Sequence, residues 1–215
     1  ASPAPSAEPY CEVGFDASLL DGRLDLEVTR YQRSTRDAII NRALPPSTGF
    51  TGSQVVNLGQ IDAWGNEIGL VARLIEGRRF SWELDTQFAT MENRIESLGD
   101  LGVIFAGTQS QHREGYSVAD MFMLRVLDVE LDANGNLVSA MCDGGTGPQG
   151  VDPGGSAVPC SEAPQVWLGK SQPTWQFGLG NTFTLFDNLR FYVRVEGNGG
   201  HLQNNTEIRA THNQS

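Results

Sequence analysis

Apolar and polar residues alternate with a period of two through several long segments of this chain, and that alternation constrains the fold most strongly. In residues 12–20 and again in 24–33 every second position is largely apolar, and Asp21-Gly22-Arg23 separates the two runs. Successive side chains of a β-strand point to opposite faces, so each run predicts a strand with one apolar and one polar face. A short turn between two such runs predicts a β-hairpin.

The same unit recurs twice. Residues 61–74 and 80–92 alternate on either side of a turn at Glu76-Gly77-Arg78. Residues 174–185 and 189–198 do so around Asp187-Asn188. We therefore predict six strands arranged as three antiparallel hairpins.

The connections between these hairpins are long and rich in Gly, Pro, Ser and Asn, at about residues 34–60 and 93–173. Strict alternation of short turns with long loops is typical of outer-membrane β-barrels. Aromatic residues near the strand ends fit the aromatic girdles of such barrels. These aromatics are Phe80, Trp82, Trp175 and Phe191. A soluble β-sandwich core would use the same residues, and this alternative stays open on pattern alone.

Composition and charge argue against a helical membrane protein and against a nucleic-acid-binding protein. The 215 residues include 25 glycines and 10 prolines, and no stretch approaches the roughly 18 apolar residues of a transmembrane helix, which excludes a helical membrane protein. The net charge of −11, without clustered basic residues, argues against binding of nucleic acid. We expect residues 1–11 to be a flexible Pro/Ala/Ser-rich lead-in and residues 12–215 to form the β-structure.

Catalytic chemistry has no visible template in the sequence. The motifs of zinc proteases, serine hydrolases and phosphate-binding loops are absent, and His112, His201 and His212 stand in loop-like sequence. Glu83-Leu84-Asp85 begins like a β-jelly-roll glucanase motif, but Phe88 occupies the position of the third acid. We expect these acids, and the pair Asp25 and Glu27, to face water on a barrel wall. We predict no enzyme activity, no catalytic residue and no cofactor.

Two further features concern metals and thiols. Asp132-Ala133-Asn134-Gly135-Asn136 resembles the opening of a calcium loop, but Leu137 replaces the required glycine, so a hairpin turn is the better interpretation and no metal site is predicted. Cys142 and Cys160 bracket a Gly/Pro-rich segment that a disulfide could close, and two free thiols are the alternative. Cys11 is left over.

The order and spacing of several sequence blocks carry a family resemblance. The blocks are EVGFDASLLDGRLDLEVTRYQRSTRDAIINRALPPSTGF, NLGQIDAWGNEIGL, FSWELDTQFATMENRIESLGD, REGYSVADMF and VWLGKSQPTWQFGLGNTFTLFDNLRFYVRVEGNGG. Their motif positions are Thr35, Asp37, Pro45, Pro46, Asn57, Gly59, Ile61, Gly65, Glu67, Phe80, Trp82, Asn93 and Ile95. From Glu12 to about Asn205 the chain resembles the C-terminal part of SusC/RagA-type TonB-dependent outer-membrane transporters.

The resemblance implies an all-β fold in which an antiparallel meander of hairpins forms part of a transmembrane β-barrel. It also implies a function, the import of large solutes such as glycans or peptides across the bacterial outer membrane. The implied partners are the parent barrel and its plug, TonB acting through an N-terminal part, outer-membrane lipid and a surface lipoprotein lid. The family's plug, TonB box and closing strands have no counterpart in the sequence, so we expect a fragment.

Two other functions remain as alternatives. A secreted β-sandwich that binds carbohydrate would pack the same apolar faces against each other. A β-sandwich glycosidase is weakened by the incomplete acid motif. If this part of a transporter contacts its solute, loop aromatics are the candidates, and we single out Tyr116 and Trp167.

Overall fold

The computed structural model describes residues 9–43, 53–99, 102–106, 109–186 and 188–204, and within these ranges the regular structure is entirely β. The chain divides into two compact units. The first contains residues 1–102, 113–117 and 173–200, and the second contains residues 103–112, 118–172 and 201–215. Among the described residues no helix is long and apolar enough to cross a membrane.

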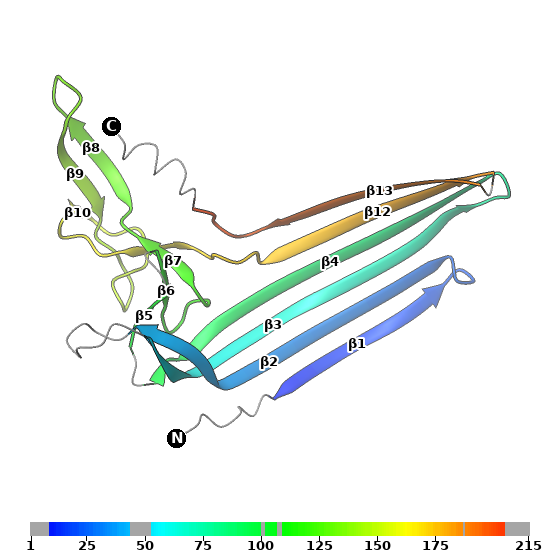
Figure 1. The fold of residues 1–215 in the computed structure, drawn as a ribbon, viewed down its shortest axis with the longest axis horizontal. Coiled ribbons are helices and arrows are strands. Elements are labelled where there is room, and N and C mark those ends of the chain that lie inside the picture. Colours follow the sequence, from blue (N-terminus) through cyan, green and yellow to red (C-terminus); the bar gives the residue numbers. More distant parts are fainter. Residues whose placement is uncertain (1–8, 44–52, 100–101, 107–108, 187, 205–215) are drawn as a thin grey trace. The chain divides into compact units, whose positions relative to one another are not determined.

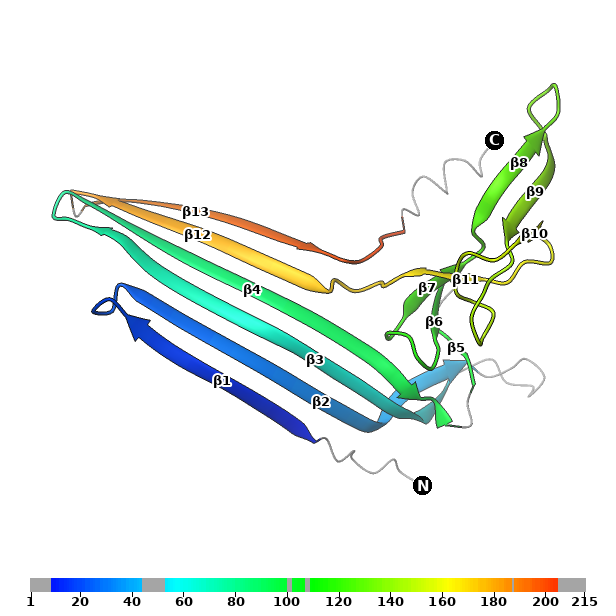
Figure 2. The same cartoon turned by 180° about the vertical axis from the view of Figure 1, so that it is seen from behind.

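The first unit is one antiparallel sheet of six strands in the order β1-β2-β3-β4-β12-β13 (Figures 1 and 2). Its strands are β1 (Tyr10–Leu19), β2 (Leu24–Ala43), β3 (Ser53–Glu76), β4 (Phe80–Ser97), β12 (Trp175–Leu185) and β13 (Leu189–Gly199). The sheet confirms the predicted all-β fold of antiparallel hairpins joined by short turns.

The second unit holds two small sheets. One has the order β11-β7-β6-β5 and the other β10-β9-β8. The strands are β5 (Ile104–Phe105), β6 (Ser110–His112), β7 (Asp120–Met123), β8 (Val126–Leu131), β9 (Leu137–Asp143), β10 (Ala157–Pro159) and β11 (Val166–Gly169). Phe122 and Val166, on the neighbouring strands β7 and β11, are fully buried and form the centre of this unit.

The long connections expected from the sequence are shorter than predicted. Strands β2 and β3 continue to Ala43 and from Ser53, where Ile40 pairs with Val56, so most of the predicted loop 34–60 is strand. Main-chain hydrogen bonds form this extension of the two strands. Its sequence lacks the alternation of apolar and polar residues on which the prediction relied. The predicted loop 93–173 contains strands β5 to β11, most of which are too short for a period of two to be recognised.

The start of the first strand also differs from the prediction. Strand β1 begins at Tyr10, so Tyr10 and Cys11 belong to the sheet and not to a flexible lead-in. Tyr10 pairs with Arg33 and Cys11 with Gln32, which fixes both residues by the β2 ladder. Residues 1–8, the Pro45-Pro46 pair and Asp187 of the third predicted turn lie outside the described residues.

Registers across the six strands bring the predicted apolar faces together on one side of the sheet. Phe15 pairs with Val28, Val28 with Ile68, and Ile68 with Phe88. Phe88 in turn pairs with Phe177. This row and the rows beside it form the apolar face, to which every strand contributes. Its members include Ala17, Leu26, Leu70, Leu84, Leu179, Phe183, Leu189, Phe191, Val193 and Val195.

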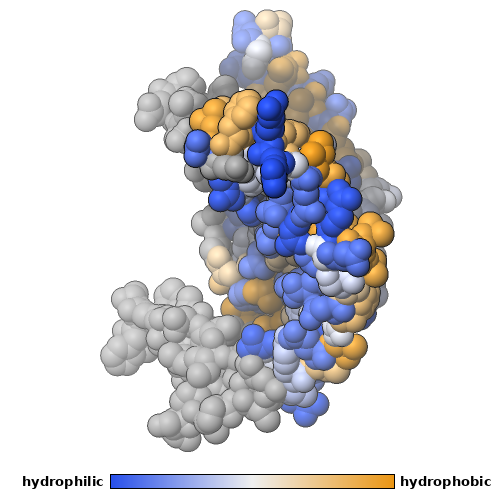
Figure 3. Space-filling view, turned by 90° about the vertical axis from the view of Figure 1, so that its right-hand side faces the viewer, coloured by the Kyte–Doolittle hydropathy of each residue, from blue (hydrophilic) through white to orange (hydrophobic). Residues whose placement is uncertain are grey.

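Most large side chains of the apolar face remain accessible. Phe15, Phe191 and Val195 are each more than half exposed. Figure 3 looks at the ends of the strands from the side of the hairpin turns, and hydrophobic side chains follow the convex side of the curved sheet. A single sheet thus carries Phe15 and Phe177 on one shared face, whereas a sandwich would place such residues on two facing sheets.

Two glycines of β3 provide a test of how closely the neighbouring strands approach this strand. A Cβ atom added at Gly65 would collide with the Thr90 carbonyl oxygen and the Tyr31 ring, whereas one added at Gly69 would lie 3.7 Å from the Glu27 Cβ, an ordinary contact. We predict that Gly65→Ala lowers the free energy of unfolding by about 2 kcal/mol, the usual cost of overpacking. Gly69→Ala is the matched control and should change it little. Urea denaturation followed by circular dichroism measures both, and equal effects would contradict this packing.

Candidate functional site

The face of the sheet opposite the apolar face is polar, and we call it the polar face. One of its rows joins Asp16, Glu27, Gly69, Gln87, Gly178 and Glu196 across all six strands. The next row joins Gly14, Thr29, Glu67, Ala89, Gln176 and Asn198. Acids therefore recur at strand after strand, as expected for a surface that faces water.

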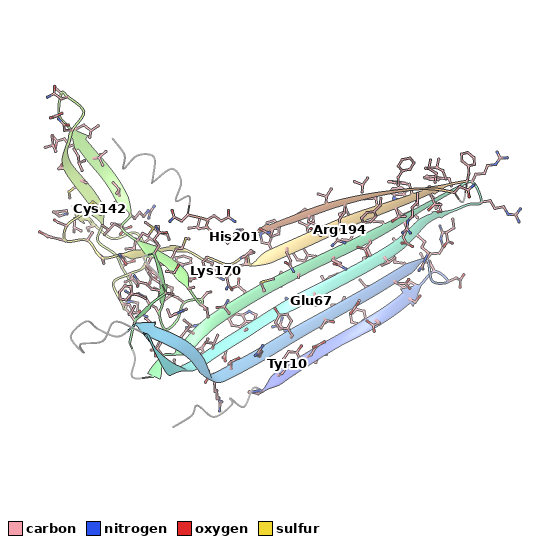
Figure 4. All side chains as sticks on the ribbon, viewed as in Figure 1. Tyr10, Glu67, Cys142, Lys170, Arg194 and His201 are labelled. Atoms are coloured by element: carbon pink, nitrogen blue, oxygen red, sulfur yellow. A yellow bond between two sulfur atoms is a disulfide. The ribbon has the colours of Figure 1, made fainter. Side chains whose placement is uncertain are left out.

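Two shallow hollows adjoin this face, and both include Gly69. The larger, of about 530 Å³, is lined on its polar side by Glu27, Glu67, Gln87, Arg194 and Glu196. The smaller, of about 450 Å³, is lined by residues that include Asp16, Asp25 and Asp85. Figure 4 labels Glu67 and Arg194, which come from β3 and β13. Glycine at positions 69 and 178 removes side chains where these hollows lie.

Arginines compensate part of the acidic charge. Arg73 Nη1 lies 3.1 Å from Asp25 Oδ2, and Arg73 Nε lies 3.7 Å from Glu83 Oε2. Arg194 Nε lies 2.5 Å from Glu196 Oε1. One acid of each glycosidase-like pair, Asp25 and Glu83, is thus held in an ion pair with the same arginine on an open surface.

The two loop aromatics singled out from the sequence lie in different units. Trp167 is on β11, and its Nε1–H donates to Asp120 Oδ2 at 2.9 Å, so its polar edge is used within the second unit. Tyr116 belongs to the first unit, where its carbonyl oxygen accepts from the Ile95 N–H at 2.9 Å. Neither unit contains both residues. Contact of either ring with a solute stays a prediction.

A disulfide joins Cys142 and Cys160 in the second unit, with an Sγ–Sγ distance of 2.05 Å (Figure 4 labels Cys142). The neighbouring Asp143 is buried, and its carboxylate accepts main-chain N–H groups of Gly145, Gly154 and Gly155 at 2.7–2.9 Å. These bonds, of which that from Gly154 acts most strongly, hold the pKa of Asp143 below its usual range. The glycine-rich segment is thus organised around one carboxylate and one covalent bond.

The segment that resembled a calcium loop is a hairpin turn. Asp132 Oδ1 accepts the Asn134 and Asn136 N–H groups, both at 2.8 Å, and Asp132 Oδ2 accepts from Asn136 Nδ2 at 2.9 Å. Gly135 has a φ of +84°, which favours glycine. Within the described residues no group of three or more His, Cys, Asp or Glu side chains could hold a metal ion.

His112 has a structural role in the second unit. Its Nδ1 accepts the main-chain N–H of Ala119 at 3.1 Å, and Ala119 has a left-handed φ of +59°. Accepting at Nδ1 requires the neutral ring, because both nitrogens of a protonated histidine are donors. Burial lowers the pKa of His112, which also favours the neutral form.

Comparison with known proteins agrees with this geometry. TonB-dependent receptor P3 of Formosa agariphila is 27% identical over 210 residues, which are 91% of this chain and 20% of the receptor. SusC, a TonB-dependent receptor of Bacteroides thetaiotaomicron, is 24% identical over 193 residues, 84% of this chain and 19% of SusC. The chain is a homologue of SusC-type TonB-dependent receptors. No protein-family model matches it.

A second F. agariphila receptor, P39, is 32% identical over 116 residues, 54% of this chain and 11% of the receptor. Among solved structures, that of the RagAB peptide transporter superimposes with a TM-score of 0.73 at 19% identity, covering 90% of this chain and 21% of the transporter chain. This likeness confirms the fold, part of a SusC/RagA-type barrel. The chain spans about a fifth of the length of the TonB-dependent receptor P3 and of SusC, and the relatives are receptors or transporters by name, not enzymes.

Sequence reasoning missed the hollows of the polar face. Each hairpin predicts which residues face each other within it, but the larger hollow also depends on the pairing of β4 with β12, which residues 98–174 separate in sequence. The recurrence of Gly69, Gly178 and Gly180 among polar residues on the strands was the available signal.

The disulfide gives a testable prediction. Its two cysteines are 18 residues apart, and closing a loop of that size stabilises a fold by about 3 kcal/mol. We expect the double variant Cys142→Ser/Cys160→Ser to lose that much stability in the second unit, and to be cleaved faster by protease between residues 143 and 159. Reducing agent should speed cleavage of the parent but not of the variant. Cleavage unaffected by reduction in both would contradict this role.

The hydrogen bond of His112 predicts a pH dependence. Because the folded-state pKa of His112 is below the ordinary value of about 6.5, the unfolded chain binds a proton that the folded chain does not, and stability falls as the pH drops from about 6.5. His112→Gln retains an acceptor that does not titrate, so it should flatten this dependence. The midpoints of urea unfolding at pH 7.5 and 5.5, compared between the parent and His112→Gln, measure this pH dependence. The Asp143 carboxyl titrates at lower pH because its pKa is lowered, and identical slopes in parent and variant would refute the assignment.

Proposed function

We propose that this chain forms part of the barrel wall of a TonB-dependent transporter in the bacterial outer membrane, together with outer loops, and that the transporter imports large solutes such as glycans or peptides. The two-faced sheet is the observation that carries this proposal. Every one of its six strands contributes to the apolar face, and the opposite face is polar. Lipid on one side and a water-filled lumen on the other require this division.

Aromatic side chains at both ends of the apolar face support a membrane location. Trp82 and Phe183 stack with ring centroids 5.7 Å apart, and Phe191 pairs with Phe183 in the same row. At the other end Trp175 stacks on Phe177 at 6.2 Å. The step from Trp175 to Phe183 along β12 is about 27 Å at 3.4 Å per residue. This is close to the apolar band of outer-membrane barrels, about 25 Å tall.

The edges of the sheet support a place within a larger barrel. Within the described residues, β1 and β13 each pair with a neighbour on one side only. Long unpaired edges expose main-chain donors and acceptors, and closing a barrel removes them. We propose that further strands of the parent barrel pair with both edges. The polar face would then face the lumen and its plug.

The remaining partners are part of the same proposal. The names of the relatives support coupling to TonB. A surface lipoprotein lid follows from the family resemblance, as does contact of the apolar face with outer-membrane lipid. We assign no enzymatic role, because the acids that suggested one are on an open face, where Arg73 pairs with both Asp25 and Glu83. The alternative of a secreted carbohydrate-binding sandwich would bury this apolar face against a second sheet, whereas Phe15, Phe191 and Val195 on it are each more than half exposed.

Tryptophan fluorescence tests the proposal. We compare two variants of the full-length protein, one retaining only Trp82 of this chain's four tryptophans and one retaining only Trp167, with phenylalanine at the other three positions. In vesicles containing brominated acyl chains, Trp82 emission should be strongly quenched because its ring is on the lipid side of the sheet. Trp167, hydrogen-bonded to Asp120 in the second unit, should be quenched little. Equal quenching, or folding as a soluble monomer without detergent, would refute a membrane wall.

A further inference from the structure

The connection between β6 and β7 covers part of an edge of β4. The ladder between β4 and β12 runs from Phe80 only as far as Thr90. Beyond it lie residues 113–117, which we call the β6–β7 tip and which belong to the first unit together with β4. The Gly115 N–H donates to the Ile95 carbonyl oxygen at 2.8 Å, and the Ile95 N–H donates to the Tyr116 carbonyl oxygen at 2.9 Å. The tip therefore takes the place of a neighbouring strand along this part of β4.

Two side-chain hydrogen bonds secure the same edge. Ser117 Oγ donates to the Asn93 carbonyl oxygen at 2.8 Å, and Glu114 Oε1 accepts the Leu98 N–H at 2.7 Å. Ser117, Leu98 and Ile95 are all buried. Uncovered strand edges expose main-chain donors and acceptors that can pair with another chain. The tip therefore satisfies main-chain groups of β4 between Asn93 and Leu98.

Both ends of the tip continue into the second unit, where His112 joins them. Strands β6 and β7 pair through Gln111 and Asp120, so His112 and Ala119 are the next residues of the hairpin toward the tip. Ala119 has a left-handed φ of +59°, and its N–H donates to His112 Nδ1 at 3.1 Å. A side chain thus supplies the last hydrogen bond across the hairpin before the tip begins.

This hydrogen bond requires a neutral ring. A protonated imidazole carries a donor at Nδ1, which would face the N–H donor of Ala119. His112 is half-buried, and burial opposes the charged form and lowers the pKa of its ring. The ionisable groups beside it are Asp120 on β7 and Arg113 and Glu114 in the tip, and the residues of the neighbouring β5 carry none. Of these groups, an arginine stays charged throughout the range in which histidine titrates.

We infer that the β6–β7 tip is a pH-sensitive cover of the β4 edge, held in place at neutral pH by the hydrogen bond between His112 and Ala119 and released in acid. Protonation sets two donors against each other, and the charged ring is hydrated as the hairpin opens beside the tip. Opening frees main-chain groups of β4 between Asn93 and Leu98, so that an extended segment can pair there. This cover does not depend on the proposed transport.

Hydrogen exchange of the full-length protein in detergent, measured by mass spectrometry at pH 7.5 and 5.5, tests this inference. The ratio of each rate to the intrinsic rate at the same pH gives an opening constant. In the opened tip His112 has the ordinary histidine pKa of about 6.5, so opening constants for residues 93–98 and 113–119 should be about tenfold higher at pH 5.5. A rise of less than about twofold would overturn the inference. Residues 24–33, in the β2–β3 ladder, should stay protected at both pH values.

Three variants assign the effect to one ring. His112→Gln retains an acceptor that does not titrate, so its opening constants should be equal at the two pH values. His201→Gln is the matched control in the same unit and should keep the rise. Glu114→Gln retains an acceptor for the Leu98 N–H and should keep it too. A rise that persists in His112→Gln, or disappears in either other variant, would overturn the inference. So would equal opening constants for the tip and residues 24–33, which indicate unfolding of the whole sheet.

Discussion

The register of the main-chain hydrogen bonds determines what this sheet can do. In a β-strand a slip of one residue exchanges the two faces, and in a six-stranded sheet every ladder must agree for one side to be apolar. Here the row from Phe15 through Val28, Ile68 and Phe88 to Phe177 shows that the ladders do agree. The same registers align the acids and glycines of the polar face. Agreement among the ladders thus creates both an apolar surface and a polar surface on one sheet.

Strands could be predicted from the sequence wherever one face is apolar and the other polar, because the residues then alternate with a period of two. Residues such as Leu24, Leu26 and Val28 share one apolar face, and their alternation with polar residues predicted both the strand and its apolar face. Where a strand continues beyond the apolar face, this alternation is lost. The extension of β2 past Arg33 is held by the same main-chain hydrogen bonds, but its sequence does not alternate between apolar and polar residues, and it was predicted as a loop.

Candidate site residues were harder to predict than strands, for a related reason. Trp167 was chosen as a loop aromatic, yet it belongs to the short strand β11 and its indole nitrogen bonds Asp120, 47 residues away. Four residues are too few to reveal a strand by period, and a contact across such a distance has no local signature. His112 is similar, because its bond to Ala119 depends on a left-handed turn that an alanine gives no reason to expect.

The spacing of the cysteines has a consequence for how the chain matures. Cys11 is exposed and carries a free thiol, so three sulfhydryls compete for partners when the nascent chain reaches an oxidising environment. Short loops close more readily than long ones, and Cys142 and Cys160 are only 18 residues apart. Local encounter thus favours the bond between Cys142 and Cys160 over mispairing of either with the distant Cys11. The entropy of loop closure alone opposes an exchange of partners with the third cysteine.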